Sequence, residues 1–224
     1  MDKEQEFISL QNELAKKIEI CPLDVSSIKF VAGVDIAYYN RDGIEWGACS
    51  IVVIDFVSRQ VVEEVSFIDK VSVPYIPGCL AFRELPLFEK AKEKLTNKID
   101  LYVFDGNGYL HPRHMGLATH AGVEHNIASI GVAKTYYKVN NVCYTPPQDK
   151  MFAYTDIVID NEVYGRAVVT KSGVRPIFLS IGNKIDLDSA YNIIISLVGE
   201  SSHIPLPTLI ADACTRKLRR LSKS

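Results

Sequence analysis

Cysteine is scarce and unpatterned in this chain of 224 residues. The five cysteines are scattered along the sequence, and no C-x-x-C pair occurs. An odd number of cysteines without paired spacing argues against a disulfide framework and against a zinc ribbon, and it suits a reducing compartment. We therefore expect a protein of the cytoplasm or nucleus, and we take the cytoplasm as its compartment.

Long hydrophobic runs and an excess of positive charge are also missing. No apolar run approaches the ~20 residues that cross a membrane, and the polar N-terminus does not resemble a signal peptide. We therefore expect no membrane partner. The net charge of −2 gives no global attraction to nucleic acid, although a local basic face is enough for phosphate contacts. One such cluster, open to interpretation as a solvated helix end or a contact face, comprises Arg216, Lys217, Arg219, Arg220 and Lys223.

The apolar content of 47% is that of one compact globular domain over residues 1–224. An amphipathic helix is predicted over residues 3–19, with Phe7, Leu10, Leu14 and Ile18 on its apolar face. Strand-like runs follow, and their short connections, one of them carrying the turn signal NRDG, favour an antiparallel meander. These runs are residues 28–39, 46–56 and 60–69.

Helices and strands alternate in the second half of the chain. Short apolar runs at 99–105 and 129–134 are typical of strands buried on both faces. A meander followed by alternating helices and strands predicts a mixed sheet with helices packed on it. Pro86 is expected to kink or divide its helix. Helices are predicted at 81–95, 116–128, 188–199 and 207–221, and further strands at 152–160, 162–170 and 175–182.

Acidic residues occur in segments that aim them at one point. Asp35 lies in the first strand run, and Asp105 closes the run at 99–105. If these strands are parallel neighbours, both carboxylates emerge at one sheet edge, where open α/β sheets hold ligands. Glu84 and Asp212, on predicted helices, can approach that edge. Each acid alone is also explained as an exposed surface residue, but two acids in apolar strands favour a site for Mg²⁺.

The chain resembles the endonuclease V family, the deoxyinosine-directed nucleases, in the motifs GVDIAYY, PYIPGCLAFRELP, FDGNGYLHPRHMGLATHAGV, IGVAKTYY and IPLPTLIADA. The resemblance covers roughly residues 28–215. It implies a ribonuclease H-like α/β fold: a mixed five-stranded sheet flanked by helices, with extra C-terminal strands and helices. It also implies cleavage of the second phosphodiester 3′ to inosine, leaving 3′-hydroxyl and 5′-phosphate ends, for repair of deaminated adenine.

The same resemblance implies the cofactor, the partner and the catalytic residues. Mg²⁺ is the implied metal, with Mn²⁺ as a substitute. Inosine-containing DNA is the implied partner, and inosine in RNA stays open. We expect a monomer. By matched position, Asp35, Glu84 and Asp105 are the metal-binding acids, and Asp212 falls near the metal. Lys134 matches the catalytic lysine, although a surface lysine at a strand end is common in general.

Histidine residues gather around the HPRH segment. The family match makes His111 a contact to the substrate phosphate or the attacking water. A loop histidine bonded to the backbone explains it equally well without the match. A zinc site built from His111, His114, His120 and His125 is an alternative, but no cysteine joins them at finger spacing and no i, i+4 pair occurs.

The PYIPG segment is expected to handle the base. Tyr75 projects from a turn stiffened by prolines, which suits a wedge inserted into a base stack, and a tyrosine packed on its own loop is the alternative. A base pocket needs close backbone approach, which glycine permits. The predicted substrate-binding residues besides Tyr75 are Pro77, Gly78, Leu80, Gly106, Gly108 and Gly116.

Some positions depart from the family pattern. Leu85 and Asn107 stand where glycine and histidine are usual, and Asn183 and Lys184 replace a histidine-arginine pair. None of these removes a metal ligand, but they put details of substrate contact in question. The rival functions are another ribonuclease H-like nuclease, such as a resolvase or strand transferase, and a non-catalytic binder of inosine-containing nucleic acid. Acids that repel phosphates argue against the pure binder.

Overall fold

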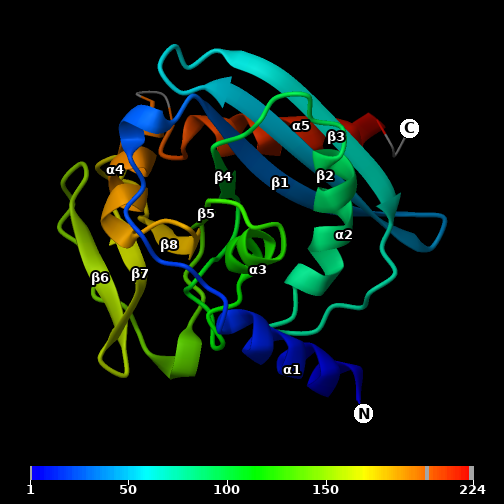
Figure 1. Cartoon of the computed structure of the whole chain (residues 1–224), viewed down its shortest axis with the longest axis horizontal. Coiled ribbons are helices and arrows are strands. Elements are labelled where there is room, and N and C mark those ends of the chain that lie inside the picture. The colour runs from blue at the N-terminus through cyan, green and yellow to red at the C-terminus, as the bar shows by residue number, and fades with distance from the viewer. Residues whose placement is uncertain (1, 200–201, 222–224) are drawn as a thin grey trace.

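A single eight-stranded sheet organises the chain in this computed structural model, which describes residues 2–199 and 202–221. The strand order is β3-β2-β1-β4-β5-β8-β7-β6 (Figure 1). The strands are β1 (Phe30–Arg41), β2 (Ile44–Asp55), β3 (Val61–Lys70), β4 (Leu101–Phe104), β5 (Ser129–Ala133), β6 (Tyr154–Ile159), β7 (Glu162–Val168) and β8 (Ile177–Asn183).

Helices cover both faces of this sheet. Helices α2 and α3 pack against one apolar layer, and α4 and α5 pack against the other. Among the described residues, no helix is both long and apolar enough to pass through a bilayer. The helices are α1 (Lys3–Ala15), α2 (Ala81–Lys92), α3 (Leu117–Glu124), α4 (Leu187–Leu197) and α5 (Leu206–Leu221), with short 3₁₀ turns at Val25–Ser27 and Val139–Asn141.

The predicted meander is confirmed. Strand β1 pairs antiparallel with β2 along its whole length, and β2 pairs antiparallel with β3. The β1–β2 turn consists of Asp42 and Gly43, both at positive φ (53° and 75°), which is the twist that two-residue hairpins need. Strand boundaries differ from the predicted ones by only a few residues.

The parallel centre of the sheet is also confirmed. Strand β1 pairs parallel with β4, from Val31↔Leu101 to Val34↔Phe104, and β4 pairs parallel with β5. Strands β1 to β5 therefore form the ribonuclease H-like five-stranded unit. The extra C-terminal strands continue the same sheet, because β8 pairs antiparallel with β5 and β7 and β6 follow it.

Strand alternation sorts the side chains of β1 between the two layers. Val31 packs with the α4 and α5 layer, whereas Ala32 and Val34 pack with the α2 and α3 layer. Gly33 faces α5, where an added Cβ would lie 2.1 Å from the carbonyl carbon of Pro207. The start of α5 thus crosses β1 in backbone contact, and only glycine permits this approach.

Helix α1 is shorter than predicted, and its buried face is partly different. Leu10 is 44% exposed, so its assignment to the apolar face is wrong. The buried positions are Gln11 and Leu14, and the Phe7 ring stacks on Phe82 at 4.0 Å. The reason is a polar anchor: the Gln11 amide donates to the carbonyl oxygens of Gly78 (3.1 Å) and Met115 (3.3 Å).

Pro86 does not divide its helix. Helix α2 runs unbroken from Ala81 to Lys92, with Pro86 inside it. The missing amide removes one helical hydrogen bond. Leu85, Leu87 and Phe88 are buried on both sides of the proline, and their packing on the sheet holds the helix together.

Candidate active site

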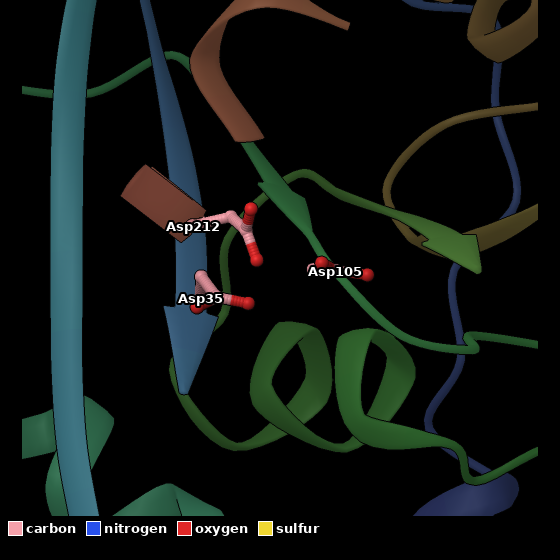
Figure 2. Close-up of side chains that lie close together, drawn as sticks. All are labelled: Asp35, Asp105 and Asp212. Atoms are coloured by element: carbon pink, nitrogen blue, oxygen red, sulfur yellow. The ribbon is translucent and has the colours of Figure 1, made fainter. Parts of the chain in front are cut away.

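Three carboxylates from distant parts of the chain meet at the carboxyl edge of the central strands (Figure 2). Asp35 lies in β1, Asp105 directly follows β4, and Asp212 lies in α5. One oxygen of each lies within 4.8 Å of the others. The predicted convergence of Asp35 and Asp105 is confirmed, because the parallel register sets these residues side by side. Asp212 joins them because α5 crosses β1 closely.

The environment of Asp35 disfavours a lone negative charge. Burial raises the pKa of Asp35 to about 6, and the charges of Asp105 and Asp212 add to this effect. A hydrogen bond from the Thr215 hydroxyl acts in the opposite direction. A divalent cation would remove the repulsion among these carboxylates, and oxygen ligands of this kind are those that Mg²⁺ prefers. The donor set therefore fits a hard divalent cation.

Basic side chains already border the acids. The ammonium of Lys134, directly after β5, donates to Asp105 Oδ2 and lies 3.6 Å from Asp212 Oδ1. Although partial burial opposes the charged form, the hydrogen bond to Asp105 raises the pKa of Lys134. Arg216 Nη2 lies 2.7 Å from Asp212 Oδ2. Asp212 thus stands between two cations.

Glu84 approaches the edge from α2 on the opposite face of the sheet. It is only 6% exposed, so the sequence-based alternative of a solvent-facing helix residue is wrong. The hydroxyl of Tyr38 donates to Glu84 Oε1 at 3.1 Å. Burial raises the pKa of Glu84 to about 8, and the charges of Asp35 and Asp105 contribute. Glu84 is outside the three-acid group but lines a cavity together with Asp105.

A cavity of about 180 Å³ opens beside the acids. Most of the residues that the sequence predicts for substrate binding line this cavity. Pro77 and Gly108 do not. Tyr75 lies at its wall with 66% of its surface exposed. The lining residues are Tyr75, Gly78, Leu80, Ala81, Glu84, Asp105, Gly106, Asn107, His111, Met115, Gly116, Leu117 and Tyr137.

Backbone contact explains two of the predicted glycines. A Cβ at Gly116 would lie 2.5 Å from the carbonyl oxygens of both Asn107 and Gly108. At Gly108 it would lie 2.1 Å from the carbonyl oxygen of Ile181. Gly108 therefore packs the loop onto β8 instead of facing the cavity. Gly116 brings the start of α3 against the same loop, which closes the cavity wall.

His111 is buried, and both of its ring nitrogens have backbone partners. Nδ1 accepts from the amides of Arg113 (3.2 Å) and Met115 (3.3 Å), so Nε2 carries the proton and donates to the Gly78 carbonyl at 3.0 Å. Burial lowers the pKa of His111 to about 3. The imidazole is neutral and ties the HPRH loop to the PYIPG turn. Its predicted contact to phosphate or water stays a prediction.

The carbonyl oxygen of Gly78 accepts hydrogen bonds from three side chains and so joins the PYIPG turn to α1 and the HPRH loop. Besides the His111 imidazole, the Gln11 amide (3.1 Å) and the Arg113 guanidinium (2.7 Å) donate to it. Arg113 also donates to Gln11 Oε1 at 2.7 Å. Gly78 itself has φ of +74°, a conformation that favours glycine. The turn that carries Tyr75 is therefore held by α1 and the HPRH loop, and neither Gln11 nor Arg113 was predicted.

The zinc alternative finds no support in residues 2–199 and 202–221. The other three histidines of this set lie beside separate glutamates: Nε2 is 3.6 Å from a Glu162 oxygen in His114, 3.7 Å from a Glu124 oxygen in His120, and 3.5 Å from a Glu89 oxygen in His125. Within these residues, the aspartates are the single group of three potential metal ligands.

Most of the residues that depart from the family pattern lie away from the acids and the cavity. Leu85 is buried in the core under α2. Asn183 accepts from the Glu19 amide (2.8 Å) and donates to the Gly122 carbonyl (3.0 Å). Asn183 pairs with the first residue of β5, so it and Lys184 lie at the edge of the sheet opposite the acids. Only Asn107 lines the cavity.

A ribonuclease H-like sheet whose carboxyl edge carries grouped carboxylates and a lysine defines a nuclease, an enzyme that hydrolyses phosphodiester bonds. The family described as Endonuclease V matches residues 12–213. The chain belongs to the endonuclease V family.

Individual relatives span almost the whole chain. Endonuclease V of Bacillus subtilis (strain 168) is 49% identical over 220 residues, which covers 98% of this chain and 92% of that protein. The crystal structure of endonuclease V from Bacillus subtilis has a TM-score of 0.96 at 48% identity and covers 100% of this chain and 94% of that one. Endonuclease V of Ciona intestinalis, in complex with a 24mer DNA containing an inosine followed by a ribo-adenosine, has a TM-score of 0.85 at 29% identity, with coverage of 100% and 99%.

Proposed function

We propose that this chain is an endonuclease that cuts nucleic acid strands near inosine for the repair of deaminated adenine in DNA. The observation that carries the proposal is the position of the cavity: Asp105 belongs both to the three-acid group and to the cavity wall. A base held in the cavity places its own strand beside the acids. The inosine-containing DNA bound by the Ciona relative supports this substrate. The proposed cut falls at the second phosphodiester 3′ to inosine and leaves 3′-hydroxyl and 5′-phosphate ends.

Asp35, Asp105 and Asp212 would hold Mg²⁺, with Mn²⁺ as a substitute, and Glu84 would contribute from the cavity side. When bound, such an ion activates water and stabilises the leaving oxygen. The buried position of Asp35 and its raised pKa support this assignment, because a cation offsets the repulsion that burial creates.

Lys134 is proposed to stabilise charge on the scissile phosphate. Its ammonium contacts both Asp105 and Asp212, so it lies beside the acids at which the proposed cut takes place. A fixed positive charge beside a developing negative charge lowers the barrier of phosphoryl transfer.

The cavity is proposed to receive the inosine base after it leaves the stack. Extruding a base costs a few kcal/mol, and an aromatic side chain that fills the gap offsets part of this. Tyr75 is exposed at the cavity and comes from a turn fixed by hydrogen bonds to Gly78, which suits this role. Backbone packed closely around Gly116, together with the Leu117 side chain beside Gly106, is proposed to leave little room for an exocyclic amino group. His111 is proposed to position this wall, and Leu80 to shape it.

Mg²⁺-dependent nicking of a labelled oligonucleotide with one inosine tests the proposal. We expect a single cut with Mg²⁺, no cut with EDTA, and no cut of the matched adenosine strand. Asp35→Asn should abolish cutting and keep binding. Equal cutting of the adenosine strand would contradict the substrate, and preferred cutting of junctions or flaps would favour the resolvase alternative. Binding without any cut would favour the non-catalytic binder.

The proposal also covers a second substrate, the oligomeric state and the compartment. Matched inosine RNA in the same assay decides whether RNA is a second substrate. We propose a monomer, which light scattering on the purified chain checks. Free cysteines at all five positions support a reducing compartment, and we propose the cytoplasm.

A further inference from the structure

The carboxylate of Glu84 has one hydrogen-bond donor among residues 2–199 and 202–221, the hydroxyl of Tyr38 at 3.1 Å from Oε1. The other oxygen, Oε2, accepts no hydrogen bond from these residues. Glu84 is buried and lines the cavity together with Asp105. A buried carboxylate oxygen without a donor is costly unless a ligand supplies positive charge, so Oε2 is suited to a cation.

Tyr38 joins Glu84 to the strand that carries Asp35. Both residues lie in β1, and successive side chains of a strand point to opposite faces. Asp35 is bonded to Thr215 of α5 on one face, whereas Ile36 packs with the α2 and α3 layer on the other. Tyr38, two residues after Ile36, is on the α2 face. The end of β1 therefore supports two carboxylates, one on each side of the sheet.

The ring of Tyr38 is held in place by Arg83. The guanidinium carbon lies 4.4 Å from the centre of the ring, and the Arg83 side chain is only 7% exposed. Nη1 donates to the Val73 carbonyl at 2.8 Å, and Nη2 lies 2.5 Å from Glu45 Oε1. A desolvated cation–π contact contributes about 2 kcal/mol. Because the ring is fixed from its face, the direction of the hydroxyl is fixed as well.

Simple packing is the alternative explanation for Tyr38. An aromatic ring between β1 and α2 fills space and covers the Arg83 guanidinium whether or not it carries a hydroxyl. Phenylalanine would meet that need without the cost of partly burying an oxygen. The hydroxyl is explained by its contact with Glu84.

We propose that Tyr38 is a positioning residue, which holds Glu84 so that Oε2 is available to the divalent cation at the acids. The inference rests on the proposed function, which gives Glu84 a part in binding that cation. Hydrogen bonds from an outer residue orient a metal ligand, and their loss typically costs about 10–100-fold in metal affinity or activity. Tyr38 acts through Glu84 and touches neither the substrate nor the cation.

Tyr38→Phe tests the inference, because it removes one oxygen and keeps the ring over Arg83. Mn²⁺ binding to the chain without DNA is measured by electron paramagnetic resonance, and we expect the Kd to rise about tenfold or more. The Mg²⁺ concentration for half-maximal cleavage should rise by a similar factor, and the KM for an inosine strand at saturating Mg²⁺ should stay unchanged. A lower Tm in EDTA with unchanged Mn²⁺ affinity would show a packing role and overturn the proposal.

Tyr102→Phe is the matched control. Tyr102 is a buried tyrosine of β4 in the same apolar layer, and its hydroxyl has no hydrogen-bond partner among the described residues. It is outside the lining of the cavity beside the acids. This variant loses the same atom and should keep the wild-type affinity for Mn²⁺. An equal loss of affinity in control and variant would overturn the proposal.

A double-mutant cycle shows whether Tyr38 acts through Glu84. If it does, Tyr38→Phe should not weaken Mn²⁺ binding further in a chain that already carries Glu84→Gln, because residues that act as one unit are not additive. The same loss of affinity in both backgrounds would mean that Tyr38 acts by another route, and would overturn the proposal.

Failure of the proposed function gives a different result. A wild-type chain that binds Mn²⁺ but leaves inosine strands uncut in Mg²⁺ contradicts the nuclease, and the Mn²⁺ comparison still decides the role of Tyr38. A wild-type chain that cuts them, with a Tyr38→Phe variant of unchanged Mn²⁺ affinity, contradicts only the positioning role. A wild-type chain that binds no Mn²⁺ contradicts both.

Discussion

The hydroxyl of Thr215 donates a hydrogen bond to Asp35 Oδ2 across a sequence separation of 180 residues. Thr215 is fully buried in α5, and Asp35 lies in β1. The bond therefore fixes the last helix to the first strand at one carboxylate. It also fixes the rotamer of Asp35, because a buried carboxylate oxygen with one strong donor has a defined direction.

Thr215→Val should disturb this carboxylate while keeping the volume of the side chain. Loss of a hydrogen bond to a charged group destabilises by about 1.5–3 kcal/mol. Because this bond lowers the pKa of Asp35, its removal should move the acid limb of the pH–rate profile to higher pH. Activity lost near pH 6.5 should return near pH 8.5. Thr215→Ser should restore the wild-type profile, and a uniform loss of rate at every pH would point to packing alone.

Glu84 should make the metal-free protein less stable as pH rises. Its folded pKa of about 8 lies above the ordinary value of 4.5, so the stability it contributes is present below about pH 4.5 and is lost as pH rises through 8. Buried histidines such as His111 oppose this only below about pH 6.5, their unfolded pKa. Thermal unfolding in EDTA between about pH 6.5 and 8.5 should show a loss on the order of 1 kcal/mol.

Glu84→Gln is the matched variant for that measurement. It should flatten the pH dependence in this window, and Mg²⁺ added at pH 8 should raise the wild-type Tm more than that of the variant. A wild-type stability that is flat from pH 6.5 to 8.5 would show that Glu84 is already ionised or solvated.

Lys134→Met should remove the cation between Asp105 and Asp212. We expect a fall in kcat of about 10²-fold or more, since a fixed charge at the phosphate acts mainly in the transition state. Lys134→Arg keeps the charge and should retain a larger part of the rate. Single-turnover cleavage of an inosine strand separates this effect from binding, and a variant with raised KM but unchanged kcat would argue for a binding role only.

Tyr75→Ala should separate base extrusion from the chemistry. Because Tyr75 is exposed, the substitution should leave Tm nearly unchanged. We expect kcat/KM on inosine duplex DNA to fall at least tenfold, with a smaller loss on single strands, where less stacking has to be broken. Tyr75→Phe, which keeps the ring, is the control. Equal losses on both substrates would contradict the wedge.

The sequence predicted Asp35 and Asp105 together because the pattern is local: each acid belongs to an apolar strand run, and a parallel register of the two runs brings the acids side by side. Glu84 was harder, since its burial depends on which face of α2 meets the sheet. Asp212 depends on how α5 crosses β1. Contacts that join distant segments, such as those of Gln11 and Arg113 with Gly78, have no sequence pattern of their own.

One signal for α5 was nevertheless present. A glycine in the middle of an apolar strand marks close approach of another backbone, and Gly33 is such a residue. Considered with the IPLP segment that begins at residue 204, it indicates a helix start lying on β1. Tyr137 and Thr215 carried no comparable signal, because aromatic and threonine residues are common in any core.

Gly33 also determines how far apart two of the three grouped carboxylates lie. It lies two residues before Asp35, and the Pro207 backbone that it contacts lies five residues before Asp212. The missing side chain of Gly33 therefore sets the distance between β1 and α5, and with it the distance between the carboxylates of Asp35 and Asp212. We expect Gly33→Ala to move Asp35 and Asp212 apart, which would change the preference of the proposed metal site among ions of different radius without any substitution of a carboxylate.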